Sequence, residues 1–326
     1  MYKKMNKKFS NIKNLNISIM GLGYLGYSNV INFSSSGLII NINDFGNKVN
    51  RANIFKNYIY PTSKIKIEFN SFNKNKINFD NIIKSSNNNI FMKKKSFIYL
   101  CNSKYLNSNN INNKFIKLIK LNTKNIRKNK PTFVIEFLNA PGKVYSDFIW
   151  KLLKINLKIG KDYDLIFAPR NDWSIDTLNE HALRPAWSNK KKALEVFRNI
   201  SRLLNQEVYE IDKLDNLEII SNLKNSLEHI SNVFINQLSL SYPKINFQNL
   251  IEDFNYLFNA NISLSGIGSM GLRLPSSSLN LIKDNKHSEQ LTILKEVIHT
   301  DFSMLKNITS KIKFNKKMKV AILGLG

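Results

Sequence analysis

The first two hundred residues alternate short apolar runs with longer mixed stretches. Continuous apolar runs are typical of strands buried on both faces of a parallel sheet. Helix-length stretches such as residues 27–36 separate them, and Asn-rich stretches at 85–89 and 102–113 are typical of loops. The pattern predicts a doubly wound α/β domain over residues 15–205. Its predicted strands are Ile17 to Met20, Leu38 to Ile42, Lys95 to Leu100, Thr132 to Phe137 and Asp164 to Ala168.

The hydrophobic period becomes helical from about residue 206 to residue 312. Such a stripe predicts an amphipathic helix whose apolar face is buried. A second helical stretch, residues 290–312, follows a Gly/Ser-rich turn over residues 264–275. We therefore expect a helical middle domain over residues 206–312. The stripe of the first helix, at steps of three and four, consists of Ile220, Leu223, Leu227, Ile230, Phe234 and Leu238.

The glycine spacing after the first strand carries the clearest chemical signal. In a dinucleotide-binding turn, the first glycine permits the tight turn and the second lets the backbone approach the pyrophosphate. The third lets the helix pack on the strand. The phosphates lie at a helix N-terminus, where free N–H groups favour anions. Asp44 ends the second strand, about where an acid binds the ribose and favours NAD over NADP. We predict NAD binding by Gly21, Gly23, Tyr24, Leu25, Gly26 and Asp44, the alternative being a chance glycine turn.

Charge and composition exclude several classes of function. The formal net charge is +26, yet only seven of the 49 basic residues are Arg, and the lysines are spread along the chain. Because Arg is the usual reader of phosphate and guanine, we expect no nucleic-acid partner. Lys, Asn and Ile together indicate an AT-rich coding sequence instead. Cys101 is the only cysteine, which excludes intrachain disulfides and cysteine metal clusters, and it lies in a strand-like run, as an inert buried thiol does.

The two ends of the chain suggest further boundaries. Residues 1–14 are basic, and no signal-peptide segment follows them, so we expect a disordered tail on a cytoplasmic protein. No run of 18 or more apolar residues occurs, so we expect no membrane partner. Residues 318–326 repeat the pattern of residues 17–23. We assign residues 313–326 to the first strand of a second, truncated nucleotide-binding domain.

In their joint order, these landmarks resemble the UDP-glucose/GDP-mannose dehydrogenase family over residues 15–326. The glycine turn, Glu136 with the following Pro141-Gly142, the helix around Asn225 and the terminal strand carry the resemblance. It implies a Rossmann-type NAD domain, a helical middle domain that forms homodimers, and a C-terminal domain that holds the nucleotide. Its implied reaction is the oxidation of a nucleotide sugar's 6-hydroxyl to a carboxylate in two hydride transfers. Implied substrate contacts are Gly266, Gly268 and Gly271.

The catalytic positions of that family are replaced here. Its cysteine, which forms the thiohemiacetal and thioester, corresponds to Arg273. The aspartate after the following proline corresponds to Ser277. The family pairs a lysine with an asparagine four residues later on one helix; Asn225 is retained, but Ser221 takes the lysine position. A glutamate and a threonine of the family correspond to Arg170 and Leu138.

The sequence therefore predicts a nucleotide-sugar dehydrogenase relative with impaired catalysis and no metal site. The alternatives are a non-catalytic NAD-binding or dimerisation partner, and a decayed relic. His229 lies four residues after Asn225 on the same face, and we interpret it as structural rather than catalytic. A further hypothesis places Arg170 and Arg273 in the cleft, where they would bind a phosphate or carboxylate.

Overall fold

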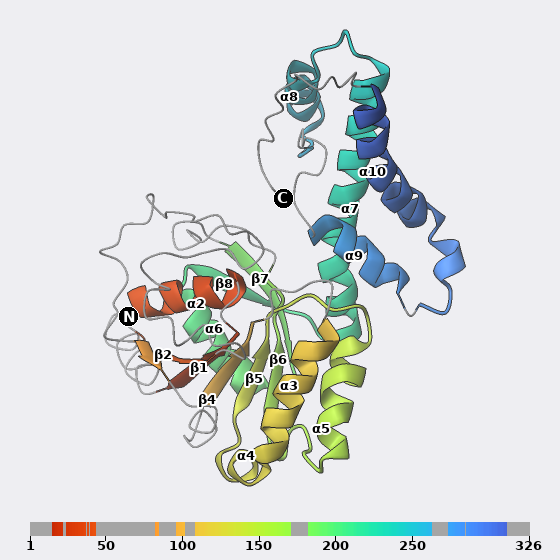
Figure 1. The fold of residues 1–326 in the computed structure, drawn as a ribbon. Coiled ribbons are helices and arrows are strands. Elements are labelled where there is room, and N and C mark those ends of the chain that lie inside the picture. Colours follow the sequence, from red (N-terminus) through yellow and green to blue (C-terminus); the bar gives the residue numbers. More distant parts are fainter. Residues whose placement is uncertain are drawn as a thin grey trace, which may run out of the picture. The chain divides into compact units, whose positions relative to one another are not determined.

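The computed structural model divides the chain into two units. One contains residues 1–138 and 142–217, and the other contains residues 139–141 and 218–326. The first is built on a sheet and the second on helices (Figure 1). The predictions for residues 1–14, Gly23, Asp44, the three glycines at 266–271 and residues 313–326 lie outside the described residues. The structure describes residues 15–21, 24–36, 38, 40–43, 82–84, 96–101, 108–170, 182–262, 273–283 and 285–311.

A largely parallel sheet forms the first unit. Its strand order is β3-β2-β1-β4-β5-β6-β7-β8, and only the β6–β7 pairing is antiparallel. The order of the first six strands is that of a doubly wound dinucleotide-binding domain. The predicted α/β fold is thus confirmed. The strands are β1 (Asn16–Met20), β2 (Ile40–Asn43), β3 (Ile82–Lys84), β4 (Ser96–Leu100), β5 (Thr132–Ile135), β6 (Asp164–Phe167), β7 (Ala182–Ser188) and β8 (Gln206–Glu210).

Helices cover both faces of this sheet (Figure 1). On one face lie α2 (Tyr24–Ser35) and α6 (Lys191–Arg202). On the other lie α3 (Ser108–Leu121), α4 (Thr123–Asn129), the π-helix η5 (Val144–Ile149) and α5 (Trp150–Lys154). The central strands are largely apolar in sequence because helices cover the sheet on both faces.

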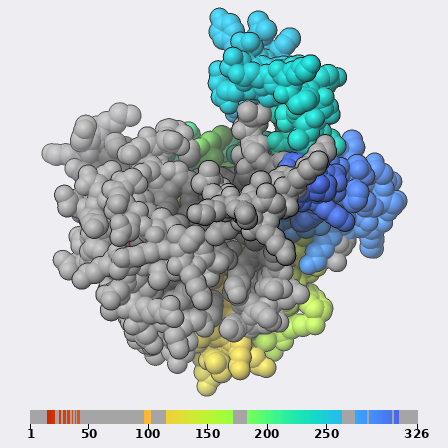
Figure 2. Space-filling view, turned by 45° about the horizontal axis from the view of Figure 1, so that its top comes forward, coloured from red at the N-terminus to blue at the C-terminus, as the bar shows by residue number. Residues whose placement is uncertain are grey.

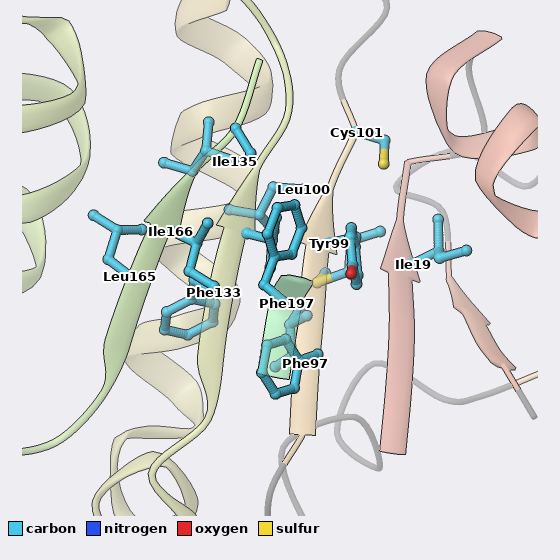
Figure 3. Close-up of a cluster of buried hydrophobic side chains, with 14 of the residues drawn as sticks. Ile19, Phe97, Tyr99, Leu100, Cys101, Phe133, Ile135, Leu165, Ile166 and Phe197 are labelled. Carbon is cyan, nitrogen blue, oxygen red and sulfur yellow. The ribbon is translucent and has the colours of Figure 1, made fainter. Parts of the chain in front are cut away.

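Aromatic side chains fill the core on both faces. Tyr99 of β4 packs on Phe33 of α2, with ring centroids 5.0 Å apart, and on Phe197 of α6 at 6.4 Å. On the opposite face, Phe133 of β5 meets Phe115 of α3 at 5.8 Å and Phe148 of η5 at 5.7 Å. Figure 3 shows Tyr99 and Phe133 projecting from adjacent strands. These rings hold the helices in place on the sheet.

Helices make up the described part of the second unit. They are α7 (Leu214–Ser241), α8 (Phe247–Phe258), α9 (Arg273–Ile282), the short η7 (Ser288–Gln290) and α10 (Thr292–Lys311). The first unit extends to Leu217, past the predicted boundary at residue 205, because β8 pairs with β7. No helix among the described residues is long and apolar enough to cross a bilayer.

The apolar stripe predicted on α7 is not buried. Four of its members, Ile220, Leu223, Leu227 and Phe234, are between 43% and 57% exposed. Polar residues occupy the buried face instead. The helical period identified the helix correctly, but the prediction that this face is covered within the chain is wrong. Periodicity shows that a helix has an apolar face, and it does not show what covers that face.

We predict that Phe133→Ala lowers the free energy of unfolding by about 3–5 kcal/mol, because the fully buried ring leaves a cavity among three other aromatic rings. Urea denaturation followed by circular dichroism measures the change. Leu121→Ala is the control, since Leu121 is 75% exposed and its truncation leaves no cavity. A loss below about 1 kcal/mol for Phe133→Ala would contradict this description of the core.

Candidate functional site

Two of the three glycines of the motif after β1, Gly21 and Gly26, lie among the described residues. Gly21 has φ +93°, a conformation that side-chain-bearing residues rarely adopt, and a Cβ there would overlap the Cys101 carbonyl. A Cβ on Gly26 would overlap the carbonyl of Gly21. Helix α2 begins at Tyr24, between these two glycines, and Leu25 is buried in the core. The first and third glycines of the motif are therefore required by packing.

This turn lies where a doubly wound sheet binds its ligand. The strand order reverses between β1 and β4, and the turn follows the carboxyl end of β1. Ligands of open α/β sheets bind outside the carboxyl ends of the strands at such a switch point. The N-terminus of α2 begins at the same place, and its backbone N–H groups favour an anion. The turn fits a dinucleotide pyrophosphate.

A buried carboxylate under α2 joins several elements of this edge. Glu136, which directly follows β5, is fully buried. It accepts a hydrogen bond from Asn29 of α2, and another from the Cys101 thiol at 3.2 Å. Arg184 of β7 donates to its Oε1 at 2.5 Å and to the Ala168 carbonyl at 2.8 Å. One carboxylate thus connects α2 with the ends of β4 and β5 and with β7.

Arg170 extends the same network from the end of β6. Its Nη1 donates to Asn29 Oδ1 at 2.9 Å and its Nη2 to Ser28 Oγ at 3.1 Å. Its backbone N–H donates to the Glu136 carbonyl at 3.0 Å. Arg170 is therefore buried and bound to α2. These contacts speak against the hypothesis that Arg170 lines a cleft with Arg273. The Arg273 side chain lies outside the described residues.

Asn29 is oriented by the charges on its two sides. Its amide nitrogen faces Glu136 and its amide oxygen faces Arg170, so each end meets a charge that it stabilises. Buried charges are tolerated when they are paired and fully hydrogen-bonded. Because Ser28 and Asn29 follow the glycine turn by one helical turn, the network fixes α2 directly behind the proposed pyrophosphate site.

Cys101 is an unreactive member of this network. It follows β4, is buried and forms no disulfide, as predicted (Figure 3). Burial, and then the charge and hydrogen bond of Glu136, raise the pKa of its thiol well above the ordinary value. A thiol with a raised pKa stays protonated, and the thiolate is the reactive form. Cys101 is therefore not a nucleophile.

The helical unit brings together three positions that the family resemblance relates. Asn225 and Ser221 share the buried face of α7, and Ser277 reaches them from α9. Asn225 Nδ2 donates to Ser277 Oγ at 3.0 Å and lies 3.5 Å from the Ser221 carbonyl. Its Oδ1 is buried, and no donor among the described residues reaches it. A buried acceptor in this state suits a hydroxyl or N–H of a ligand.

His229 has structural partners. Its Nδ1 lies 3.0 Å from Ser278 Oγ of α9, and its Nε2 lies 3.2 Å from Asp301 Oδ2 of α10. The buried ring thereby joins three helices. This agrees with the structural interpretation of His229. Among the described residues, no group of three or more His, Cys, Asp and Glu side chains is arranged to bind a metal ion.

We compared the chain with known proteins and found similarity only to solved structures. No protein-family model matches the chain, and no curated protein is significantly similar. A UDP-D-ManNAc dehydrogenase from Pyrococcus horikoshii matches with a TM-score of 0.71 at 18% identity, over 90% of this chain and 70% of that chain. A UDP-glucose dehydrogenase from Pyrobaculum islandicum matches with a TM-score of 0.70 at 14% identity, over 90% and 69%. The chain has the fold of nucleotide-sugar dehydrogenases.

A third match has a different nucleotide in its name. A GDP-mannose dehydrogenase from Pseudomonas aeruginosa, in a ternary complex, has a TM-score of 0.59 at 17% identity, over 90% of this chain and 71% of that chain. The likeness thus extends across dehydrogenases named for different nucleotide sugars. It does not distinguish among their substrates.

We predict that Glu136→Gln lowers the free energy of unfolding by about 3–5 kcal/mol, because Arg184 loses its buried counter-ion. Chemical denaturation measures the loss. The control is Glu210→Gln, which breaks the partly exposed pair with Arg198 and costs at most about 1 kcal/mol. Equal losses of stability for the two variants would contradict the claim that the buried network stabilises the fold more than an exposed ion pair does.

Proposed function

We propose that this chain is a member of the nucleotide-sugar dehydrogenase family that retains NAD binding and has lost the oxidation of the sugar to its acid. The observation that carries the proposal is a contrast between two sites. Gly21 and Gly26 keep a turn that no larger residue fits. The positions expected for lysine and aspartate hold Ser221 and Ser277, which carry no charge; Asn225 donates to the Ser221 backbone carbonyl and to Ser277 Oγ.

The residues of the turn have distinct parts in cofactor binding. Gly21 and Gly26 let α2 begin close behind β1, so its free N–H groups point toward the pyrophosphate. Gly23, Tyr24 and Leu25 complete the turn, and Asp44 accepts from the ribose hydroxyls. NAD supplies a two-electron hydride acceptor when it is bound.

The replaced positions account for the loss of oxidation. Arginine at position 273 has no nucleophilic sulfur, so it cannot form the thioester that the second hydride transfer needs. Serine at position 221 brings no positive charge to stabilise a developing alkoxide. Asn225 Oδ1 still accepts a hydrogen bond from a sugar hydroxyl, with Gly266, Gly268 and Gly271 as further contacts. The nucleotide sugar is then held without being converted, and we place this role in the cytoplasm.

A titration with NADH tests the cofactor part of this proposal. Energy transfer from the tryptophans to the nicotinamide should rise saturably with NADH. Gly23→Val should abolish it while the melting temperature stays unchanged, since this glycine serves the approach of the pyrophosphate. Absence of saturable binding by the folded wild-type chain would reject NAD binding. Formation of NADH from NAD with UDP- or GDP-sugars would reject the loss of oxidation.

We also propose that the exposed stripe on α7 binds a second copy of the chain. Ile220, Leu223, Leu227 and Phe234 lie at helical spacing on one face, and a contiguous apolar surface of this kind marks an interface. The family resemblance implies dimers through the middle domain, and it therefore indicates that the partner of this stripe is a second copy of the chain. A dimerisation partner without catalysis is therefore the second candidate function. Pairing with an intact homologue would use the same stripe.

Leu227→Asp should convert a dimer into a monomer, because each copy would place a carboxylate against the other's apolar stripe. Sedimentation velocity measures the change in mass. Leu121→Asp, which changes a still more exposed leucine in the sheet unit, should leave the dimer intact. A wild-type chain that sediments as a monomer at all concentrations tested would reject homodimerisation through α7.

A further inference from the structure

One edge of the sheet unit concentrates basic side chains. It is formed by the end of α3, by α4 and by the turn after α5, at the amino ends of β5 and β6. Figures 1 and 2 both place the α3–α4 segment beside α5. We call this surface the basic edge. Its exposed cations are Arg127 and six lysines, Lys120, Lys124, Lys128, Lys130, Lys158 and Lys161.

Two hydrogen bonds show that the segments of the basic edge are adjacent. Arg127 of α4 donates to the Asn156 carbonyl, in the turn after α5, at 2.8 Å. The Asp164 N–H donates to the Pro131 carbonyl at 3.0 Å, so the segments that lead into β5 and β6 are adjacent. These two links bring cations that lie about thirty residues apart in sequence onto one edge.

The acidic side chains near this edge leave its charge uncompensated. Asp162 is buried and accepts from the backbone N–H of Lys158 at 2.8 Å. Asp164 pairs with Lys190, which lies at the start of α6. Neither carboxylate is therefore presented among the lysines of the basic edge.

The lysine-rich composition alone does not explain this surface. Helix α7 is 28 residues long and carries Lys224 as its one lysine or arginine. The sequence suggested that lysines are spread along the whole chain. Among the residues that the structure describes, the lysines are unevenly distributed, few on α7 and many on the basic edge.

Exposed apolar side chains lie in the segments of the basic edge and in the adjoining helix α5. Leu121, at the end of α3, is 75% exposed and adjoins Lys120 in sequence. Leu153 and Trp150 of α5 are also exposed. Lysine next to exposed leucine and tryptophan is the composition of surfaces that lie on a membrane, where apolar groups enter the headgroup region and ammonium groups meet anionic lipids.

We propose that the basic edge docks on the surface of an anionic lipid bilayer. Nucleic acid suits it less well, because its exposed cations other than Arg127 are lysines, and the Arg127 guanidinium already donates to the Asn156 carbonyl, whereas arginine is preferred for phosphate and base recognition. The Trp150 ring is also covered by Lys154, whose ammonium lies 3.4 Å from the ring centroid, so that this face does not receive a stacked base. Exposed leucines gain from lipid and gain nothing from a hydrated phosphate backbone.

The proposal does not depend on the proposed function. The basic edge lies at the amino ends of the strands, and the glycine turn lies at a carboxyl end. Docking there leaves the turn accessible. The expectation of no membrane partner rested on the absence of a spanning segment, and a surface contact requires none.

Vesicle flotation with the full chain tests the proposal. Vesicles of phosphatidylcholine mixed with phosphatidylglycerol should carry the protein upward, and vesicles of pure phosphatidylcholine should not. The triple change Lys124→Gln, Lys128→Gln and Lys158→Gln should weaken binding roughly 100-fold, at about 1 kcal/mol for each cation. High salt should weaken it as well.

A matched triple variant controls for net charge. Lys191→Gln, Lys192→Gln and Lys213→Gln removes three exposed cations from elsewhere on the same unit and should change binding little. Leu121→Ser with Leu153→Ser should weaken binding at unchanged charge. Equal losses for the two triple variants would overturn the proposal, as would no flotation with anionic vesicles. Tight binding of an RNA oligonucleotide by the same lysines, with no vesicle binding, would assign the surface to nucleic acid.

Discussion

The buried carboxylate of Glu136 is the constraint on which the candidate cofactor site depends. A charge removed from water must be matched by fixed partners, and here the partners come from α2, β4 and β7. Arg170 adds the end of β6 through Asn29. The same contacts that satisfy the charge hold α2 against the carboxyl edge of the sheet. The glycine turn therefore has a rigid support behind it.

The sequence predicted five of the eight strands in the described sheet and little of its buried network, for a physical reason. Strands covered on both faces are continuously apolar, so runs such as residues 132–137 are visible within a few residues. The partners of Glu136 are remote, since Arg184 lies 48 positions away and Asn29 lies 107 positions away. A glutamate in a buried run signals that a counter-ion exists, and periodicity cannot identify it.

The helical unit shows a different limit of sequence patterns. Periodicity located α7 and placed Ser221 and Asn225 on one face, which the structure confirms. It assigned the apolar face to the interior, whereas the interior of the unit holds Asn225, His229 and the serines of α9. A helix that buries its polar face and exposes its apolar face has the same sequence period as a helix that does the opposite. Only the contacts distinguish them.

The central claim is that the turn supported by Glu136 still binds a dinucleotide although the catalytic positions have changed. A crystal structure of the chain grown with NAD tests this most directly. The account predicts pyrophosphate density against the backbone between Gly21 and Gly26, at the N-terminus of α2. Density for the dinucleotide at any other place, with this turn unoccupied at saturating NAD, would contradict it.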